Sequence, residues 1–163
     1  MKRVSLLAPA IFALSLPALA ATAWQSAPDF TLTDSHGKSV QLSDFKGKYV
    51  VLEWTNPGCP FVRNHYNTRT MQGLQSEWVA KNVVWLSIDS SSRSSWDFLP
   101  AEKLGRWMQE KGAAQSAVLV DSESGTTKLY QAKTTPHMFV VDPEGMLVYA
   151  GVVSIAIHPR ASV

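Results

Sequence analysis

The chain has 163 residues, with 15 lysines and arginines, 13 acidic residues and a formal net charge of +2 at pH 7. This near balance excludes the strongly basic surface with which proteins bind nucleic acid or anionic membranes, so we expect neither partner. The length suits one domain with a hydrophobic core of its own.

Residues 1–23 predict a secretory signal peptide. Lys2 and Arg3 precede an apolar run over residues 4–20, which ends in small residues suited to cleavage. Two prolines interrupt this run, and its length lies at the lower limit for a membrane span, so the alternative of a membrane anchor is disfavoured. We therefore expect an exported protein, periplasmic or secreted, that has no contact with the membrane after cleavage.

Residues 24–152 predict one α/β domain. Alternating apolar and polar residues around a turn predict a β-hairpin, and nearly continuous apolar runs predict strands that are buried on both faces. The expected elements are a hairpin over 30–42, a capped turn at 43–45, strands at 49–54, 83–88, 117–120, 137–141 and 146–149, and helices after residue 59, around 71–78 and over 100–112. This alternation predicts a layered sheet with right-handed crossovers.

Cys59 is the only cysteine of the chain, and it lies between the first buried strand and the start of a predicted helix. Unpaired N–H groups and the helix dipole favour a thiolate at such a position. Pro60 suits the first helical position, and Arg63, one turn after Cys59 on the same face, would add positive charge. Since there is no second cysteine, a disulfide within the chain is impossible.

Two distant motifs resemble the thioredoxin superfamily. The segment Cys59-Pro60-Phe61-Val62 has the frame of a Cys-X-X-Cys motif with Val62 at the second cysteine position, and Thr134-Thr135-Pro136 precedes the penultimate strand. In the superfamily, a cis proline at that place faces the active cysteine. The segments 27–30 and 51–56 resemble the redoxin branch, which includes the alkyl hydroperoxide reductase and thiol-specific antioxidant family.

This resemblance covers roughly residues 27–151 and implies a thioredoxin-like layered sheet with an N-terminal β-hairpin extension. It implies Cys59 as the reactive thiol, with Thr135, Pro136, Arg63 and Thr55 as further site residues. Peroxiredoxins carry a threonine three residues before the reactive cysteine. In this chain Asn56 occupies that position and the threonine is one residue earlier.

The end of the chain departs from the same pattern. Relatives usually continue into a last helix that covers the sheet, whereas residues 153–163 form a short tail that contains a proline. We therefore expect that C-terminal helix to be missing.

From these observations we predict a thiol oxidoreductase, similar to a one-cysteine peroxiredoxin, which reduces a small oxidant, either a peroxide or a disulfide. An external thiol or a thioredoxin-like reductant would resolve the intermediate, and we expect no cofactor and no metal. Two alternatives stay open. One is a redox-inactive thioredoxin-like binding module, and the other is a copper site formed by Cys59, His65 and His137, which lacks the usual second cysteine.

Overall fold

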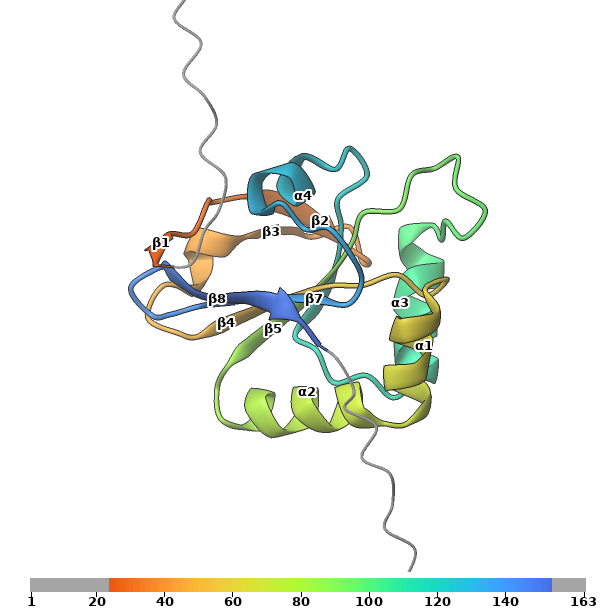
Figure 1. Ribbon diagram of the computed structural model, residues 1–163, viewed down its shortest axis with the longest axis horizontal. Coiled ribbons are helices and arrows are strands. Elements are labelled where there is room, and N and C mark those ends of the chain that lie inside the picture. The colour runs from red at the N-terminus through yellow and green to blue at the C-terminus, as the bar shows by residue number, and fades with distance from the viewer. Residues whose placement is uncertain (1–23, 154–163) are drawn as a thin grey trace, which may run out of the picture.

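The computed structural model describes residues 24–153 (Figure 1). The predicted signal peptide over 1–23 lies outside the described residues, as do the last ten residues of the predicted tail. In the part of the chain that is described, no helix has the length and apolar character needed to cross a membrane.

One mixed sheet of eight strands forms the centre of the fold, in the order β1-β8-β7-β4-β5-β6-β2-β3. The strands β4, β5 and β6 are parallel, whereas β7 and β8 run antiparallel to their neighbours. Their bounds are β1 Gln25–Ser26, β2 Thr31–Asp34, β3 Ser39–Gln41, β4 Val50–Trp54, β5 Val84–Asp89, β6 Ala117–Val120, β7 His137–Val141 and β8 Met146–Val152. The predicted hairpin is confirmed as β2–β3, and it extends the sheet by pairing with β6.

Between residues 24 and 153, four α-helices and one short 3-10 helix connect the strands. They are η1 Leu42–Phe45, α1 Pro60–Asn67, α2 Thr70–Ala80, α3 Ala101–Glu110 and α4 Gly125–Tyr130. In Figure 1, α4 and the β2–β3 hairpin lie on one side of the central strands, and α2 lies on the other with α1 and α3 at one end. The expected α/β order is therefore confirmed, and the fold is thioredoxin-like.

The alternating side chains of β4 divide the core between the two faces of the sheet. Val50, Leu52 and Trp54 point into a cluster that also contains residues of β5, β7 and α4. Val51 points into a second cluster, formed with residues of α1, α2 and α3. Because both faces are covered, every residue of β4 is buried, as its continuous apolar run predicts.

Two elements were not expected from the sequence. The strand β1 has only two residues, too few to show a periodic pattern. The helix α4 has six residues, starts after a left-handed Ser124 and contains two β-branched threonines, which have modest helix propensity. Its position depends on tertiary contacts: the side chain of Thr127 bonds to Asp121, and Tyr130 packs against Trp54.

An apolar groove of about 550 Å³ lies on the α2 side of the sheet, between α2 and the strands β4, β5, β7 and β8. Its lining includes three half-exposed aromatic residues, Tyr49, Trp78 and Tyr149. The exposure of these three side chains shows that the groove is open to solvent among the described residues. The predicted absence of a C-terminal helix concerns residues 154–163, which lie outside the described part of the chain.

Candidate active site

The turn between β4 and α1 positions Cys59. The backbone N–H of Cys59 bonds to the carbonyl of Asn56 at 3.0 Å, which closes the turn. The carbonyl of Cys59 then accepts the N–H of Arg63 at 3.0 Å and begins α1, with Cys59 at the N-cap and Pro60 at the first helical position. The prediction that Cys59 lies at a helix start is therefore confirmed, and the structure adds that this residue is half-buried.

The loop before β7 meets this turn. The thiol of Cys59 donates a hydrogen bond to the backbone carbonyl of Thr135, with a sulfur–oxygen distance of 3.2 Å, although 76 residues separate the two. The peptide bond between Thr135 and Pro136 is cis. The pairing of β4 with β7 accounts for this meeting, because Trp54 at the end of β4 lies opposite His137 at the start of β7.

The remaining predicted site residues lie at different depths. Arg63 is exposed on α1, one turn after Cys59. Thr55 is 1% exposed, and its hydroxyl has no hydrogen-bond partner among the described residues. Val62, at the second cysteine position of the motif, is completely buried in the α1–α3 core cluster.

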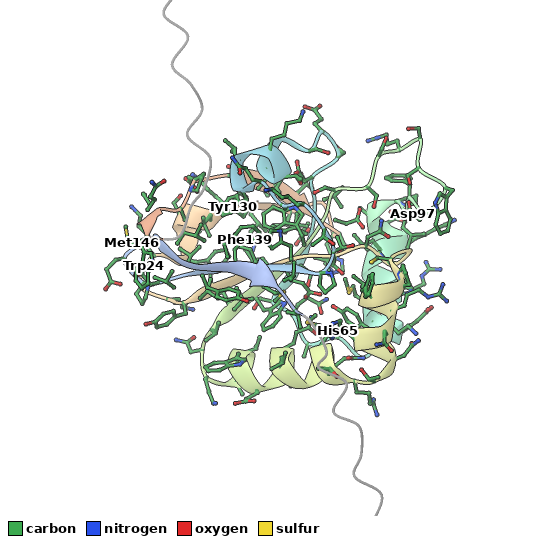
Figure 2. All side chains as sticks on the ribbon, in the orientation of Figure 1. Trp24, His65, Asp97, Tyr130, Phe139 and Met146 are labelled. Atoms are coloured by element: carbon green, nitrogen blue, oxygen red, sulfur yellow. The ribbon has the colours of Figure 1, made fainter. Side chains whose placement is uncertain are left out.

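A polar cluster at the Cys59 turn was not predicted from the sequence. The side-chain carbonyl of Asn56 accepts the N–H of Gly58 at 2.5 Å, while its amide donates to Ser91 at 3.0 Å and to Asp97 at 2.9 Å. Ser95 also bonds to Asp97, and this bond holds the pKa of the Asp97 carboxyl below its usual value. Figure 2 shows Asp97 on the loop between β5 and α3. The cysteine turn and this loop are thus joined by side-chain hydrogen bonds.

A buried carboxyl group lies beneath the turn, on β4. Glu53 is completely buried and accepts hydrogen bonds from four side chains that come from α1, α2 and β5: Tyr66, Gln75, Trp85 and Ser87. Burial raises the pKa of Glu53 above its usual value, even though all four hydrogen bonds act in the opposite direction. The sequence places a glutamate in an apolar strand, but it does not reveal these partners.

The two histidines of the copper alternative differ in their surroundings. His65 is buried in α1, where its Nδ1 has no hydrogen-bond partner among the described residues. His137 is half-buried, and burial lowers the pKa of its imidazole, with a smaller effect from Lys133. Across residues 24–153, no three histidine, cysteine or acidic side chains are grouped closely enough to hold a metal ion.

The family follows from a match that spans most of the chain. Residues 24–150 match the AhpC/TSA family, which is the family that the motifs around Cys59 and Pro136 resemble. This chain belongs to the AhpC/TSA family. The match includes both motifs, the strands β1 to β7 and most of β8.

Similar proteins include a thiol-disulfide oxidoreductase and a peroxiredoxin. The AhpC/TSA chain is 26% identical over 129 residues to the thiol-disulfide oxidoreductase ResA of Bacillus subtilis, and the match covers 75% of this chain and 63% of ResA. It is 51% identical to the peroxiredoxin Bcp of Bacillus subtilis over 39 residues, which cover 22% of this chain and 25% of Bcp. The chain thus spans slightly less than two thirds of ResA.

Solved structures show the same fold. The thioredoxin domain of a thiol-disulfide oxidoreductase from Bacteroides vulgatus superposes with a TM-score of 0.63 at 24% identity, and the match covers 80% of this AhpC/TSA chain and 89% of that domain. At this level of identity, the likeness supports the thioredoxin-like fold.

Proposed function

We propose that this protein is a thiol-disulfide oxidoreductase in which Cys59 is the attacking thiol. The observation that carries the proposal is the placement of Cys59. Cys59 is a half-buried residue at the N-terminus of α1, and its sulfur contacts the Thr135 carbonyl. The thiolate of such a cysteine is the nucleophile in disulfide exchange. The similarity to ResA, which is named for this activity, supports the same assignment.

The reaction has two exchange steps. In the first step, the Cys59 thiolate attacks one sulfur of a substrate disulfide; a bond forms between the two sulfurs, and the other substrate sulfur leaves as a thiolate. In the second step, an external thiolate attacks the substrate sulfur of this mixed disulfide and releases Cys59 as a thiolate. The external thiol supplies the electrons, because Cys59 is the only cysteine of the chain.

The other predicted site residues support this chemistry to different degrees. We propose that Thr135 and Pro136 form the backbone wall against which the substrate sulfur approaches, since the Thr135 carbonyl already contacts Sγ of Cys59. Arg63 adds positive charge on the exposed face of α1. We assign no step to Thr55, because its side chain is buried and a substrate would not reach it directly.

Peroxide reduction is the second candidate, and the local similarity to the peroxiredoxin Bcp favours it. In that reaction the Cys59 thiolate attacks a peroxide oxygen, the O–O bond breaks, and a sulfenic acid and a hydroxide or alkoxide form. An external thiol would then give a mixed disulfide and water, and a second thiol would release Cys59. The environment argues for disulfides, because Asn56 stands where peroxiredoxins carry threonine and its amide is bonded to Ser91 and Asp97.

Steady-state turnover tests the proposal. Excess glutathione reduces a small model disulfide, such as a mixed aromatic disulfide, and the rate is measured in the presence and in the absence of the protein. The protein used is a form without residues 1–23. We expect protein-dependent turnover that Cys59→Ser abolishes and Arg63→Gln reduces severalfold. Equal rates for the parent and Cys59→Ser would overturn the proposal. Measuring peroxide consumption with the same samples compares the rate of peroxide reduction directly with the rate of disulfide reduction.

A further inference from the structure

The polar cluster beside Cys59 joins two segments that are distant in the sequence. Asn56 precedes the cysteine by three residues, and Asp97 belongs to the loop between β5 and α3, 41 residues further along the chain. The amide of Asn56 donates to the Asp97 carboxylate at 2.9 Å and to the Ser91 hydroxyl at 3.0 Å. Each hydrogen-bonding atom of the Asn56 side chain therefore has a partner.

The same asparagine also fixes the backbone of the cysteine turn. Its side-chain oxygen accepts the N–H of Gly58, and its backbone carbonyl accepts the N–H of Cys59. A carbonyl oxygen and an amide nitrogen on one side chain can serve both ends of this arrangement, whereas a threonine hydroxyl has a single donor hydrogen and could not donate to both Ser91 and Asp97. Asn56 thus connects the position of the loop to the position of Cys59.

Gly58 shows how closely the loop approaches the turn. A Cβ atom built at Gly58 would overlap the side chain of Asp97, so any larger residue would push the carboxylate away. Gly73 on α2 offers a matched comparison, because a Cβ built there meets nothing within 4 Å. The hydrogen bond from Ser95 lowers the pKa of the Asp97 carboxyl and so favours its ionised form, and an ionised acceptor strengthens the bond from Asn56.

We propose that Asn56 and Asp97 are positioning residues for Cys59, and that the loop over residues 90–99 controls the reactivity of the thiol through them. The proposal rests on the proposed function for its biological meaning. The hydrogen bonds hold the cysteine turn in one arrangement, with Sγ at the start of α1 and next to Thr135. Releasing the turn by even 1 Å would slow attack, since reaction rates depend steeply on the placement of the reacting atom.

A charge-swap experiment tests the pair. Asn56→Asp cannot donate to Asp97 and places two carboxylates together, so the turn loses its bond to the loop and the added negative charge disfavours the reactive thiolate; we expect native-state alkylation of Cys59 by iodoacetamide at pH 7 to slow about tenfold. Adding Asp97→Asn places the amide donor on the loop and leaves the carboxylate acceptor on the turn, so a hydrogen bond can form in the opposite direction. The double variant should therefore regain an alkylation rate within about threefold of the parent. Rates are measured far below the unfolding midpoint, which is recorded for each variant.

Gly58→Ala provides a second test in case Asn56→Asp does not fold. We expect Gly58→Ala to slow alkylation severalfold, while Gly73→Ala leaves the rate unchanged. A lowered unfolding midpoint with a parental alkylation rate would overturn the proposal, because the pair would then serve stability alone. Failure of the double variant to recover the rate would overturn it as well.

The alkylation assay separates this inference from the proposed function. The assay needs no substrate disulfide. If the parent protein shows no disulfide turnover but Asn56→Asp is alkylated more slowly than the parent, the proposed function is wrong and the positioning role is retained. If the parent protein turns over the disulfide but all variants are alkylated at the same rate, the proposed function is retained and the positioning role is wrong.

Discussion

Glu53 and Trp85 form a hydrogen bond inside the protein, where the indole Nε1 of Trp85 donates to the Glu53 carboxylate at 2.8 Å. The two residues lie on adjacent parallel strands, β4 and β5. Both are buried, Glu53 completely and Trp85 to 3% exposure. Replacing the carboxyl with an apolar group would leave this N–H and the donors of Tyr66, Gln75 and Ser87 without their acceptor.

We therefore expect Glu53→Leu to lower the free energy of unfolding by about 3–5 kcal/mol, because each buried donor left without its acceptor costs about 1–3 kcal/mol. Glu53→Gln retains an oxygen for the shared donors and an amide that can donate to the Tyr66 hydroxyl, so its loss should be much smaller at neutral pH. Urea unfolding at pH 7 measures both variants. Similar losses for leucine and glutamine would contradict this account of the network.

The pH dependence of stability gives a second prediction for Glu53. Burial raises its pKa in the native state above the unfolded-state value of about 4.5, so the native protein holds this proton more tightly than the unfolded chain. The resulting stabilisation is fully present below the unfolded-state pKa and is lost as pH rises through the raised native pKa. The unfolding free energy of the parent minus that of Glu53→Gln should therefore fall with rising pH and then level off.

Taking this difference cancels the other titrating groups that both proteins share. Urea unfolding between about pH 4 and pH 8 covers the window in which an acid with a raised pKa changes charge. A difference that stays constant or increases with pH would be inconsistent with a carboxyl group whose pKa is raised by burial.

Thr127 connects α4 to the core. Its hydroxyl accepts the indole N–H of Trp54 at 2.8 Å and donates to Asp121 at 2.8 Å. Thr127→Val keeps the shape but leaves the Trp54 donor unpaired, so we expect a loss of about 1–3 kcal/mol in the free energy of unfolding. Ser122→Ala is the matched control, because Ser122 is exposed nearby and should change stability by less than about 0.5 kcal/mol. Equal effects would show that the hydrogen bond contributes nothing.

The apolar groove beside α2 predicts binding of a hydrophobic fluorescent dye. Tyr149 is 46% exposed and lines the groove, so Tyr149→Lys should reduce dye fluorescence severalfold while leaving the unfolding midpoint nearly unchanged. Trp96→Ser is the control, because Trp96 is also exposed but lies on the loop between β5 and α3, away from the groove. If the Trp96 variant lost the dye signal and the Tyr149 variant kept it, the groove would not be the dye site.

The sequence predicts the fold well because its strongest signals are local. The continuous apolar run ending at Trp54 predicts a strand buried on both faces, and all five residues of β4 are buried. The position of Cys59 follows from Pro60 and the helical spacing after it, and α1 begins where expected. Resemblance to a family predicted that Pro136 faces the cysteine, and in the structure the carbonyl of the preceding residue, Thr135, contacts Sγ.

The parts that were missed depend on contacts between distant residues. Nothing around Asp97 indicates that its carboxylate would bond to Asn56, because loop conformation decides this contact. Similarly, a glutamate within an apolar strand does not reveal that Trp85 and its neighbours supply donors to it. The helix α4 carries weak local propensity and is held by the bonds of Thr127.

The most direct test of the central claim is to follow the mass of the intact protein after exposure to an oxidant. Reduced protein lacking residues 1–23 is mixed with glutathione disulfide or with hydrogen peroxide in the presence of a sulfenic-acid trap. The account predicts rapid formation of one mixed disulfide at Cys59, faster than trapping of a sulfenic acid and absent in Cys59→Ser. A Cys59 that reacts with glutathione disulfide no faster than free cysteine, or that forms mainly the trapped sulfenic acid, would contradict it.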